Sequence, residues 1–169
     1  MDISIEKLKS TDQKNLYAFE LENRAFFEEM VLSRGNDYYK PEIFRSRHRA
    51  LLAEQSEGIS YFYLIKDQEG TILGRINLVD INKNSKTGHL GYRVGQQHTG
   101  KGIAKTALQL LLEKVSELGI KQILAKTTSN NTASQKVLKK NGFTQMEDSN
   151  DEFEMNGLKL KFVSYSWTN

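Results

Sequence analysis

HLGYRVGQQHTGKGIAKTALQLLL, which spans His89–Leu112, contains three successive patterns that set the architecture of the chain. Apolar residues alternate over His89–Val94, which predicts a short strand. A polar, glycine-rich loop then covers Gly95–Gly102. Apolar residues next recur at helical spacing as far as Leu118, which predicts an amphipathic helix. The predicted order is strand, glycine loop, helix.

The start of this helix is suited to a phosphate group. Its first-turn N–H groups lack partners inside the helix, and the helix dipole adds partial positive charge there. Gly100 and Gly102 let a ligand approach the backbone, while Lys101 adds a full charge. These features indicate a phosphate or pyrophosphate site, and the alternative is a plain strand-to-helix turn. The loop is not a Walker A sequence, because Gly102 follows Lys101, and it lacks the G-x-G of the dinucleotide fingerprint.

The loop also fits a known pattern. Residues Gln97–Gly102 have the order Gln or Arg, any two residues, Gly, any residue, Gly or Ala. They resemble the pyrophosphate loop of the GNAT superfamily of acetyl-CoA-dependent N-acetyltransferases, as do the flanking Gly91–Tyr92 and Ile103–Ala104. Downstream, Asn131–Ser134 followed by Asn141–Phe143 resembles the second signature of that superfamily. The pairing is most similar to the branch that acetylates the N-termini of ribosomal proteins.

The resemblance implies a mixed α/β (α+β) fold in a single domain over residues 1–169. We expect a central, mostly antiparallel sheet of six to seven strands, splayed in the middle and flanked by about four helices. In that fold the strand matching His89–Val94 is bulged. It splays from a parallel strand that matches Gln122–Lys126, and the pantetheine arm of the cofactor lies in the opening.

Periodicity and turn residues predict the other elements. Strands are expected over 2–8, 61–65, 72–81, 143–146 and 160–167, with a polar hairpin over 147–161. Helices are expected over 12–31, 41–57 and from Asn131 to Gly142. Tyr38, Tyr39 and Phe44 are candidates either for the core or for the wall of an acceptor site.

The resemblance also implies acetyl-CoA as co-substrate and no metal. Tyr92 and Val94 would offer backbone groups to the pantetheine arm, and Asn131 would anchor the arm through its amide. The full set expected to contact the cofactor is Tyr92, Arg93, Val94, Gln97, His98, Thr99, Gly100, Lys101, Gly102, Ile103, Ala104, Asn131, Ala133 and Ser134.

Candidate catalytic residues follow from the same comparison. Ser134 stands where the branch places a hydroxyl near the CoA sulfur, so it is the candidate general acid; the alternative is a local backbone bond. His89 occupies a position where many relatives carry Glu, and Glu152 and Glu154 lie where the branch has a candidate carboxylate. Each is a possible general base, a structural residue or, for the glutamates, part of a charged hairpin tip. A water chain without a dedicated base is the further alternative.

Composition narrows the class. The chain has 169 residues, 38% hydrophobic and 27% charged, which is typical of one globular domain. Zero cysteines exclude disulfides, thiolate metal sites and a cysteine nucleophile, so direct attack by the acceptor is expected. No apolar run reaches the roughly 20 residues of a membrane span, and the N-terminus does not resemble a signal peptide. We therefore expect a cytoplasmic protein without a membrane partner, as a monomer or homodimer.

The acceptor is the open question. The leading hypothesis is the N-terminal amine of a protein. The acidic segment Glu20–Asp37 instead favours a cationic small molecule such as a polyamine, with an amino acid or aminoglycoside as related choices. Other classes are a non-catalytic CoA-binding regulatory domain and an RNA-binding protein that uses Arg45–Arg49. We expect no specific nucleic-acid partner, because this basic run also suits a solvated helix face.

Overall fold

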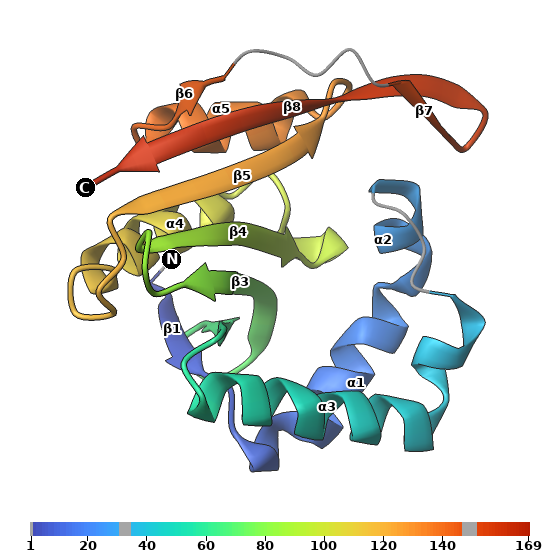
Figure 1. Ribbon diagram of the computed structural model, residues 1–169. Helices are drawn as coiled ribbons and strands as arrows, with labels where there is room; N and C mark the ends of the chain where they lie inside the picture. Colours follow the sequence, from blue (N-terminus) through green and yellow to red (C-terminus); the bar gives the residue numbers. More distant parts are fainter. Residues whose placement is uncertain (1, 31–34, 147–151) are drawn as a thin grey trace.

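One sheet runs through the molecule, and helices lie on both of its faces (Figure 1). The computed structural model describes residues 2–30, 35–146 and 152–169. Within these residues the strand order is β1-β2-β3-β4-β5-β8-β6, and β7 pairs with β8. The strands are β1 Ser4–Lys7, β2 Tyr61–Lys66, β3 Ile72–Asn82, β4 Thr87–Val94, β5 Gln122–Thr128, β6 Thr144–Gln145, β7 Glu152–Met155 and β8 Leu158–Thr168. The predicted mixed, mostly antiparallel α/β fold is confirmed.

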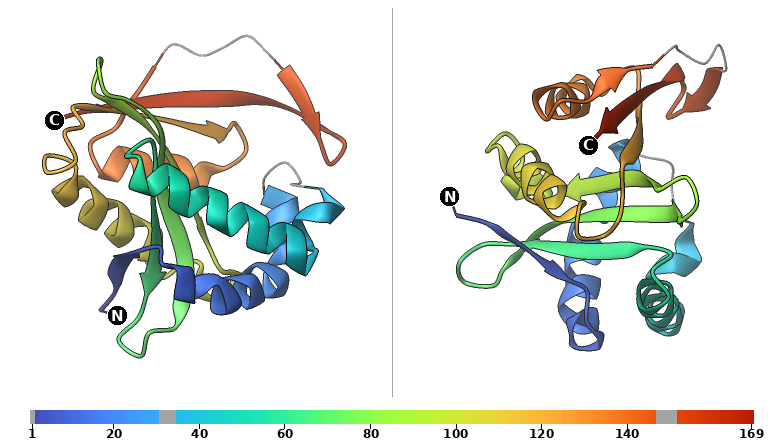
Figure 2. Two further views of the ribbon diagram at one scale, coloured as in Figure 1. Left: turned by 60° about the horizontal axis from the view of Figure 1, so that its bottom comes forward. Right: turned by 60° about the vertical axis from the view of Figure 1, so that its left-hand side comes forward.

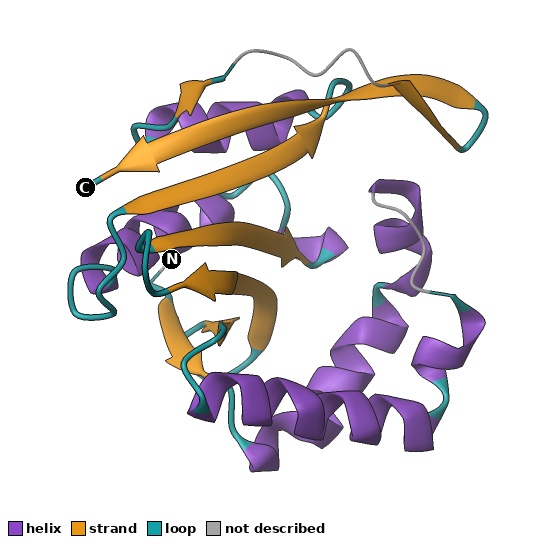
Figure 3. Ribbon diagram, in the orientation of Figure 1, coloured by secondary structure: helices purple, strands orange, loops and turns teal. Residues whose placement is uncertain are grey.

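The helices form two groups around this sheet (Figures 2 and 3). They are α1 Gln13–Glu22, α2 Arg24–Met30, α3 Pro41–Ser56, α4 Ile103–Lys114 and α5 Thr132–Lys140, with 3-10 turns η1 Ser10–Asp12, η2 Asn36–Tyr39 and η3 Gln96–His98. Ile76 and Leu78 of β3 are buried in one core cluster with α4. Phe62 and Leu64 of β2 are buried in a second cluster with α1, α2 and α3. No helix among the described residues is long and apolar enough to cross a bilayer.

The predicted helix over 12–31 is two helices, because the chain breaks at Asn23. The Asn23 side chain is buried and donates from Nδ2 to the backbone oxygen of Phe19 at 2.9 Å. Its Oδ1 accepts from the backbone N–H of Gln96 at 2.8 Å, in the loop after β4. A tertiary bond to that loop therefore accompanies the break. The described helices number five, where about four were expected. Val31 lies outside the described residues.

The tail contains one strand more than predicted. β7 lies within the segment expected to be a polar hairpin and pairs antiparallel with β8. Its charged residues Glu152 and Glu154 alternate with Phe153 and Met155, so only half of its residues are apolar. Residues 147–151, which the same prediction included, lie outside the described part of the chain.

The sheet opens between its two central strands. β4 and β5 pair in parallel only over Thr87–Leu90 and Gln122–Ala125. Beyond these residues the two strands diverge, while β4 stays paired with β3 and β5 with β8 (Figure 1). The predicted splay is confirmed. We call the opening between residues 91–94 and 126–128 the wedge.

The predicted bulge in β4 is wrong. β4 pairs with β3 in continuous register from Val94 to His89. The register shifts instead in β3, between Val79 and Asn82, where Asp80 has a φ of +50°. The divergence of β4 from β5 therefore does not come from an extra residue in β4.

Candidate active site

The loop after β4 enters α4 through two glycines with positive φ, Gly100 at +75° and Gly102 at +77°. Nothing lies within 4 Å of the Cβ that either glycine would carry, so the backbone faces open space. Gly102 caps α4, whose first-turn N–H groups have no acceptor within the helix. This bend therefore presents amides and a helix dipole in the way that a phosphate group requires.

A cavity of about 290 Å³ lies along this bend, and we call it the loop cavity. Most residues predicted to hold the cofactor line it, namely Tyr92, Arg93, Val94, His98, Thr99, Gly100, Gly102, Ile103, Ala104, Asn131, Ala133 and Ser134. Gln97 and Lys101 do not line it, and both are exposed. The Gln97 amide instead donates from Nε2 to Glu22 Oε1 at 3.2 Å, so it is turned toward α1.

Two aromatic rings of the loop cavity were missed from the sequence. Phe26 and Phe27 of α2 line it beside the residues of β4, α4 and α5. Their spacing marks them only as apolar positions of a helix, which is the signal that core residues also give. The break at Asn23, which depends on a tertiary bond, starts the separate helix that carries them.

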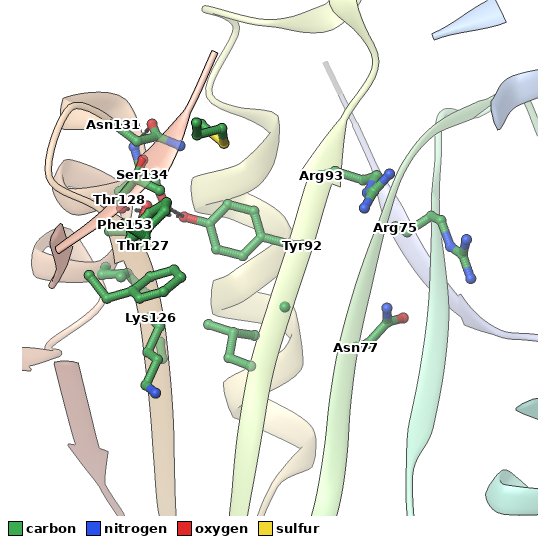
Figure 4. Close-up of a pocket in the computed structure, with 16 residues that line it drawn as sticks. Arg75, Asn77, Tyr92, Arg93, Lys126, Thr127, Thr128, Asn131, Ser134 and Phe153 are labelled. Carbon is green, nitrogen blue, oxygen red and sulfur yellow. Dashed lines mark hydrogen bonds between the residues drawn. The ribbon is translucent and has the colours of Figure 1, made fainter. Parts of the chain in front are cut away.

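Ser134 is fixed by the N-cap of α5 and by a tyrosine of β4. The cap residue Asn131 accepts from the Ser134 backbone N–H at 3.1 Å through Oδ1. Tyr92 Oη lies 2.7 Å from Ser134 Oγ, and Figure 4 shows the tyrosine ring reaching across to α5. Burial raises the pKa of Tyr92 to about 12, against the opposing effect of its hydrogen bond to Ser134. Tyr92 is therefore a neutral phenol at ordinary pH.

A second cavity, of about 390 Å³, occupies the wedge, and we call it the wedge cavity (Figure 4). It shares Tyr92, Arg93, Asn131 and Ser134 with the loop cavity, so the two meet at the hydroxyl pair. Arg75 and Asn77 of β3 form another part of its wall, and Phe153 and Met155 of β7 a third. The sequence offered no local signal for these four residues, because the wall combines strands that are far apart along the chain.

A third cavity, of about 420 Å³, lies between α3 and the sheet, and we call it the α3 cavity. It shares Arg75 and Asn77 with the wedge cavity. Tyr38 and Phe44, the candidates for the core or for an acceptor wall, line this cavity, and both are buried in the core. Tyr39 is buried in the same cluster but does not line the cavity.

An ion-pair cluster supports the wall of the wedge cavity from behind. Glu20 of α1 is fully buried, and its Oε1 lies 2.7 Å from Nη1 of Arg75. Its Oε2 lies 3.5 Å from Nη1 of Arg93, whose guanidinium also packs over the Phe27 ring. Burial alone would lower the pKa of Arg75, but the charge of Glu20 and the hydrogen bonds of Glu20 and Tyr38 outweigh it and raise the pKa.

The three candidate bases lie outside the wall of the wedge cavity. His89 is exposed and sits in the paired part of β4, in register with Val79 and Leu124. Glu152 and Glu154 are also exposed, because in β7 it is the alternating Phe153 and Met155 that line the cavity. The structure therefore does not bring His89, Glu152 or Glu154 together with Ser134.

Comparison with known families decides which chemistry this geometry serves. Residues 3–144 match the family described as acetyltransferase (GNAT) domain. The chain belongs to the GNAT family. It is therefore an acetyl-CoA-dependent acetyltransferase, and the predicted co-substrate is confirmed. The open glycine bend at Gly100 and Gly102 fits the pyrophosphate of acetyl-CoA, because a side chain at either position would fill that space.

Two curated relatives illustrate the range of this GNAT protein's similarity. The probable N-acetyltransferase YjcK of Bacillus subtilis is 28% identical over 163 residues, which cover 92% of this chain and 88% of the relative. The ribosomal-protein-serine acetyltransferase of Escherichia coli is 30% identical over 109 residues, which cover 60% of each chain.

Solved structures with the same fold act on different acceptors. The ribosomal-protein-S5-alanine acetyltransferase of Vibrio fischeri superposes with a TM-score of 0.91 at 22% identity, covering 100% of this chain and 94% of that one. The spermidine N-acetyltransferase of Vibrio cholerae superposes with a TM-score of 0.83 at 16% identity, covering 98% and 95%. These likenesses establish the fold and leave the acceptor to be argued from the site.

Proposed function

We propose that this GNAT enzyme transfers the acetyl group of acetyl-CoA directly to the N-terminal amine of a protein. The observation that carries the proposal is the meeting of the loop cavity and the wedge cavity at Tyr92 and Ser134. Direct transfer needs both substrates held at one point in a ternary complex. The chain contains no cysteine to form a thioester intermediate of its own. Similarity to ribosomal-protein acetyltransferases supports a protein N-terminus as the acceptor.

The residues of the loop cavity would hold the co-substrate, which supplies an activated thioester. The first-turn amides of α4 would bind its pyrophosphate, and the edge of β4 beyond Leu90, where pairing with β5 ends, would pair with the pantetheine arm. The acceptor amine would approach through the wedge cavity, past Arg75 and Asn77.

The reaction joins the amine nitrogen to the acetyl carbon and breaks the carbon–sulfur bond. In this proposal Ser134 donates a hydrogen bond to the departing thiolate, and Tyr92 positions the Ser134 hydroxyl. The described residues that line the wedge cavity include no carboxylate and no imidazole. In this proposal the proton of the attacking amine passes to water.

The proposal is tested by thiol release from acetyl-CoA with pairs of peptides that differ only at the α-amine. We expect a peptide with a free N-terminus to release thiol and to gain one acetyl group at that amine. The same peptide with a blocked α-amine and a free lysine side chain is the control and should be inactive. Because the enzyme has no cysteine, a thiol reagent reports only on CoA. Equal turnover of both peptides would refute N-terminal selectivity.

A further inference from the structure

The charged residues in the described wall of the wedge cavity are all basic. Arg75 of β3, Arg93 of β4 and Lys126 of β5 line it, and they come from three neighbouring strands (Figure 4). The buried Glu20 lies behind the two arginines and pairs with both. Counted together, these four groups leave the acceptor side of the wedge with a net positive charge. Such a wall attracts negative charge and repels an additional cation.

The exposed position of Lys126 makes this charge available to a substrate. Lys126 follows Ala125, the last β5 residue that pairs with β4, so it stands at the point where the wedge opens. Its ammonium lies 5.8 Å from the centre of the Phe162 ring, which also lines the wedge cavity. Lys126 is thus a charge at the mouth of the cavity rather than part of the buried ion-pair cluster.

The neutral part of the wall is suited to an amine or amide N–H. Asn77 lies beside Arg75 in the wall that the wedge cavity and the α3 cavity share. Its Oδ1 is buried and has no hydrogen-bond partner among the described residues. A buried acceptor oxygen is costly when it has no donor, so an N–H group of the substrate would complete this site.

Three of the acidic residues that favour a polyamine in the sequence already pair with cations. Glu20 is buried in its ion pairs with Arg75 and Arg93. Glu28 pairs with Arg24 at 3.1 Å, and Asp37 pairs with Lys40 at 2.8 Å. Each of these three carboxylates therefore already has a cationic partner, which weakens the argument for a polycation at this segment.

We propose that the acceptor site selects an amine flanked by negative charge, namely a peptide N-terminus followed by acidic side chains. The inference rests on the proposed function and narrows its substrate class. Asn77 receives an N–H of the peptide, while Lys126 and the two arginines attract the carboxylates. The same charges repel a polyamine, which brings several cations into the wedge.

The test compares thiol release by the full-length enzyme with three acceptors: a peptide with acidic residues after its N-terminus, the same peptide with lysines in their place, and spermidine. We expect kcat/KM for the acidic peptide to exceed that for the basic peptide by about fivefold or more, as for a charge contact near the surface. Lys126→Gln should reduce this ratio by about threefold and Lys126→Glu should reduce it further. Lys121 is also exposed and precedes β5 at the end where β5 pairs with β4, away from the opening of the wedge. Lys121→Gln should therefore leave the ratio unchanged.

The outcomes separate the inference from the proposed function. A ratio near one, or spermidine turnover above that of the acidic peptide, would overturn the inference while acetyl transfer itself stands. An equal shift in Lys121→Gln and Lys126→Gln would also overturn it, because the preference would then reflect overall charge rather than the wedge. If the enzyme releases no thiol from acetyl-CoA with any of the three acceptors, both the proposed function and the inference are refuted.

Discussion

Replacing Tyr92 with phenylalanine removes one oxygen from the centre of the proposed site. The ring remains to fill the space between β4 and α5, but Ser134 Oγ loses a partner at 2.7 Å. If Tyr92 directs the Ser134 hydroxyl toward the departing thiolate, the loss of this bond should lower kcat by about tenfold, which corresponds to about 1.4 kcal/mol. The KM for acetyl-CoA should change less, since the first-turn amides of α4 that we propose as the pyrophosphate site are untouched.

The raised pKa of Tyr92 decides how this hydroxyl acts. With a pKa of about 12, Tyr92 holds its proton far more tightly than a thiol with an ordinary pKa of about 8.5. Full proton transfer from Tyr92 to the thiolate is therefore uphill, and Tyr92 should act only as a hydrogen-bond donor. Ionisation of Tyr92 should therefore cause no loss of activity below pH about 10. In that range the pH profiles of the wild type and Tyr92→Phe should have the same shape.

The raised pKa of Tyr92 also implies that the free energy of unfolding depends on pH. Because the folded protein holds the Tyr92 proton more tightly than the unfolded chain does, the stabilising contribution is complete below pH about 10 and is lost as the pH rises toward about 12. As the pH rises from about 10 to about 12, the free energy of unfolding, measured with urea, should fall less for Tyr92→Phe than for the wild type.

The assay is a double-mutant cycle with Tyr92→Phe, Ser134→Ala and the double variant. If the two hydroxyls act as one unit, the double variant should be about as slow as the slower single variant. Binding of CoA and of an analogue lacking sulfur, measured by calorimetry, should show that either variant loses part of the preference for CoA. The matched control is Tyr17→Phe. It removes a tyrosine hydroxyl that donates to the backbone oxygen of Tyr39, and it should retain full activity. Additive losses in the cycle, or an unaltered preference for CoA, would show that the two hydroxyls do not act together on the thiolate.

Two further predictions concern the buried cluster and the glycine bend. Glu20→Gln removes the carboxylate that pairs with the buried Arg75 and the neighbouring Arg93. It should lower the free energy of unfolding by about 3 kcal/mol, measured by urea denaturation. A change within experimental error would show that the cluster does not stabilise the fold. Gly102→Ala places a side chain at a φ of +77° in the open space before α4, so it should cost about 1 kcal/mol of stability and weaken CoA binding by about tenfold in calorimetry. Unchanged CoA affinity in Gly102→Ala would remove the bend from the cofactor site.

Local features of the sequence predicted the secondary structure around the loop cavity. The N-cap role of Asn131, the helix after Gly102 and the strand ending at Val94 all follow from neighbouring residues, and the structure has each of them. Local features did not predict which side chains line the wedge cavity. Glu152 and Glu154 were candidate bases, yet the pleat of β7 turns Phe153 and Met155 toward the wedge cavity instead. Charge alone does not tell which face of a short strand lines a cavity.

The strand, glycine loop and helix that line the loop cavity follow from local sequence, because spacing and backbone freedom act between residues close along the chain. Long-range packing instead sets the pairing of Tyr92 with Ser134, the burial of Glu20 beneath Arg75, and the break at Asn23. Each of these contacts joins residues that are distant in sequence, and its energy depends on burial and on the direction of approach. Those quantities exist only once the sheet has formed and its two central strands have separated.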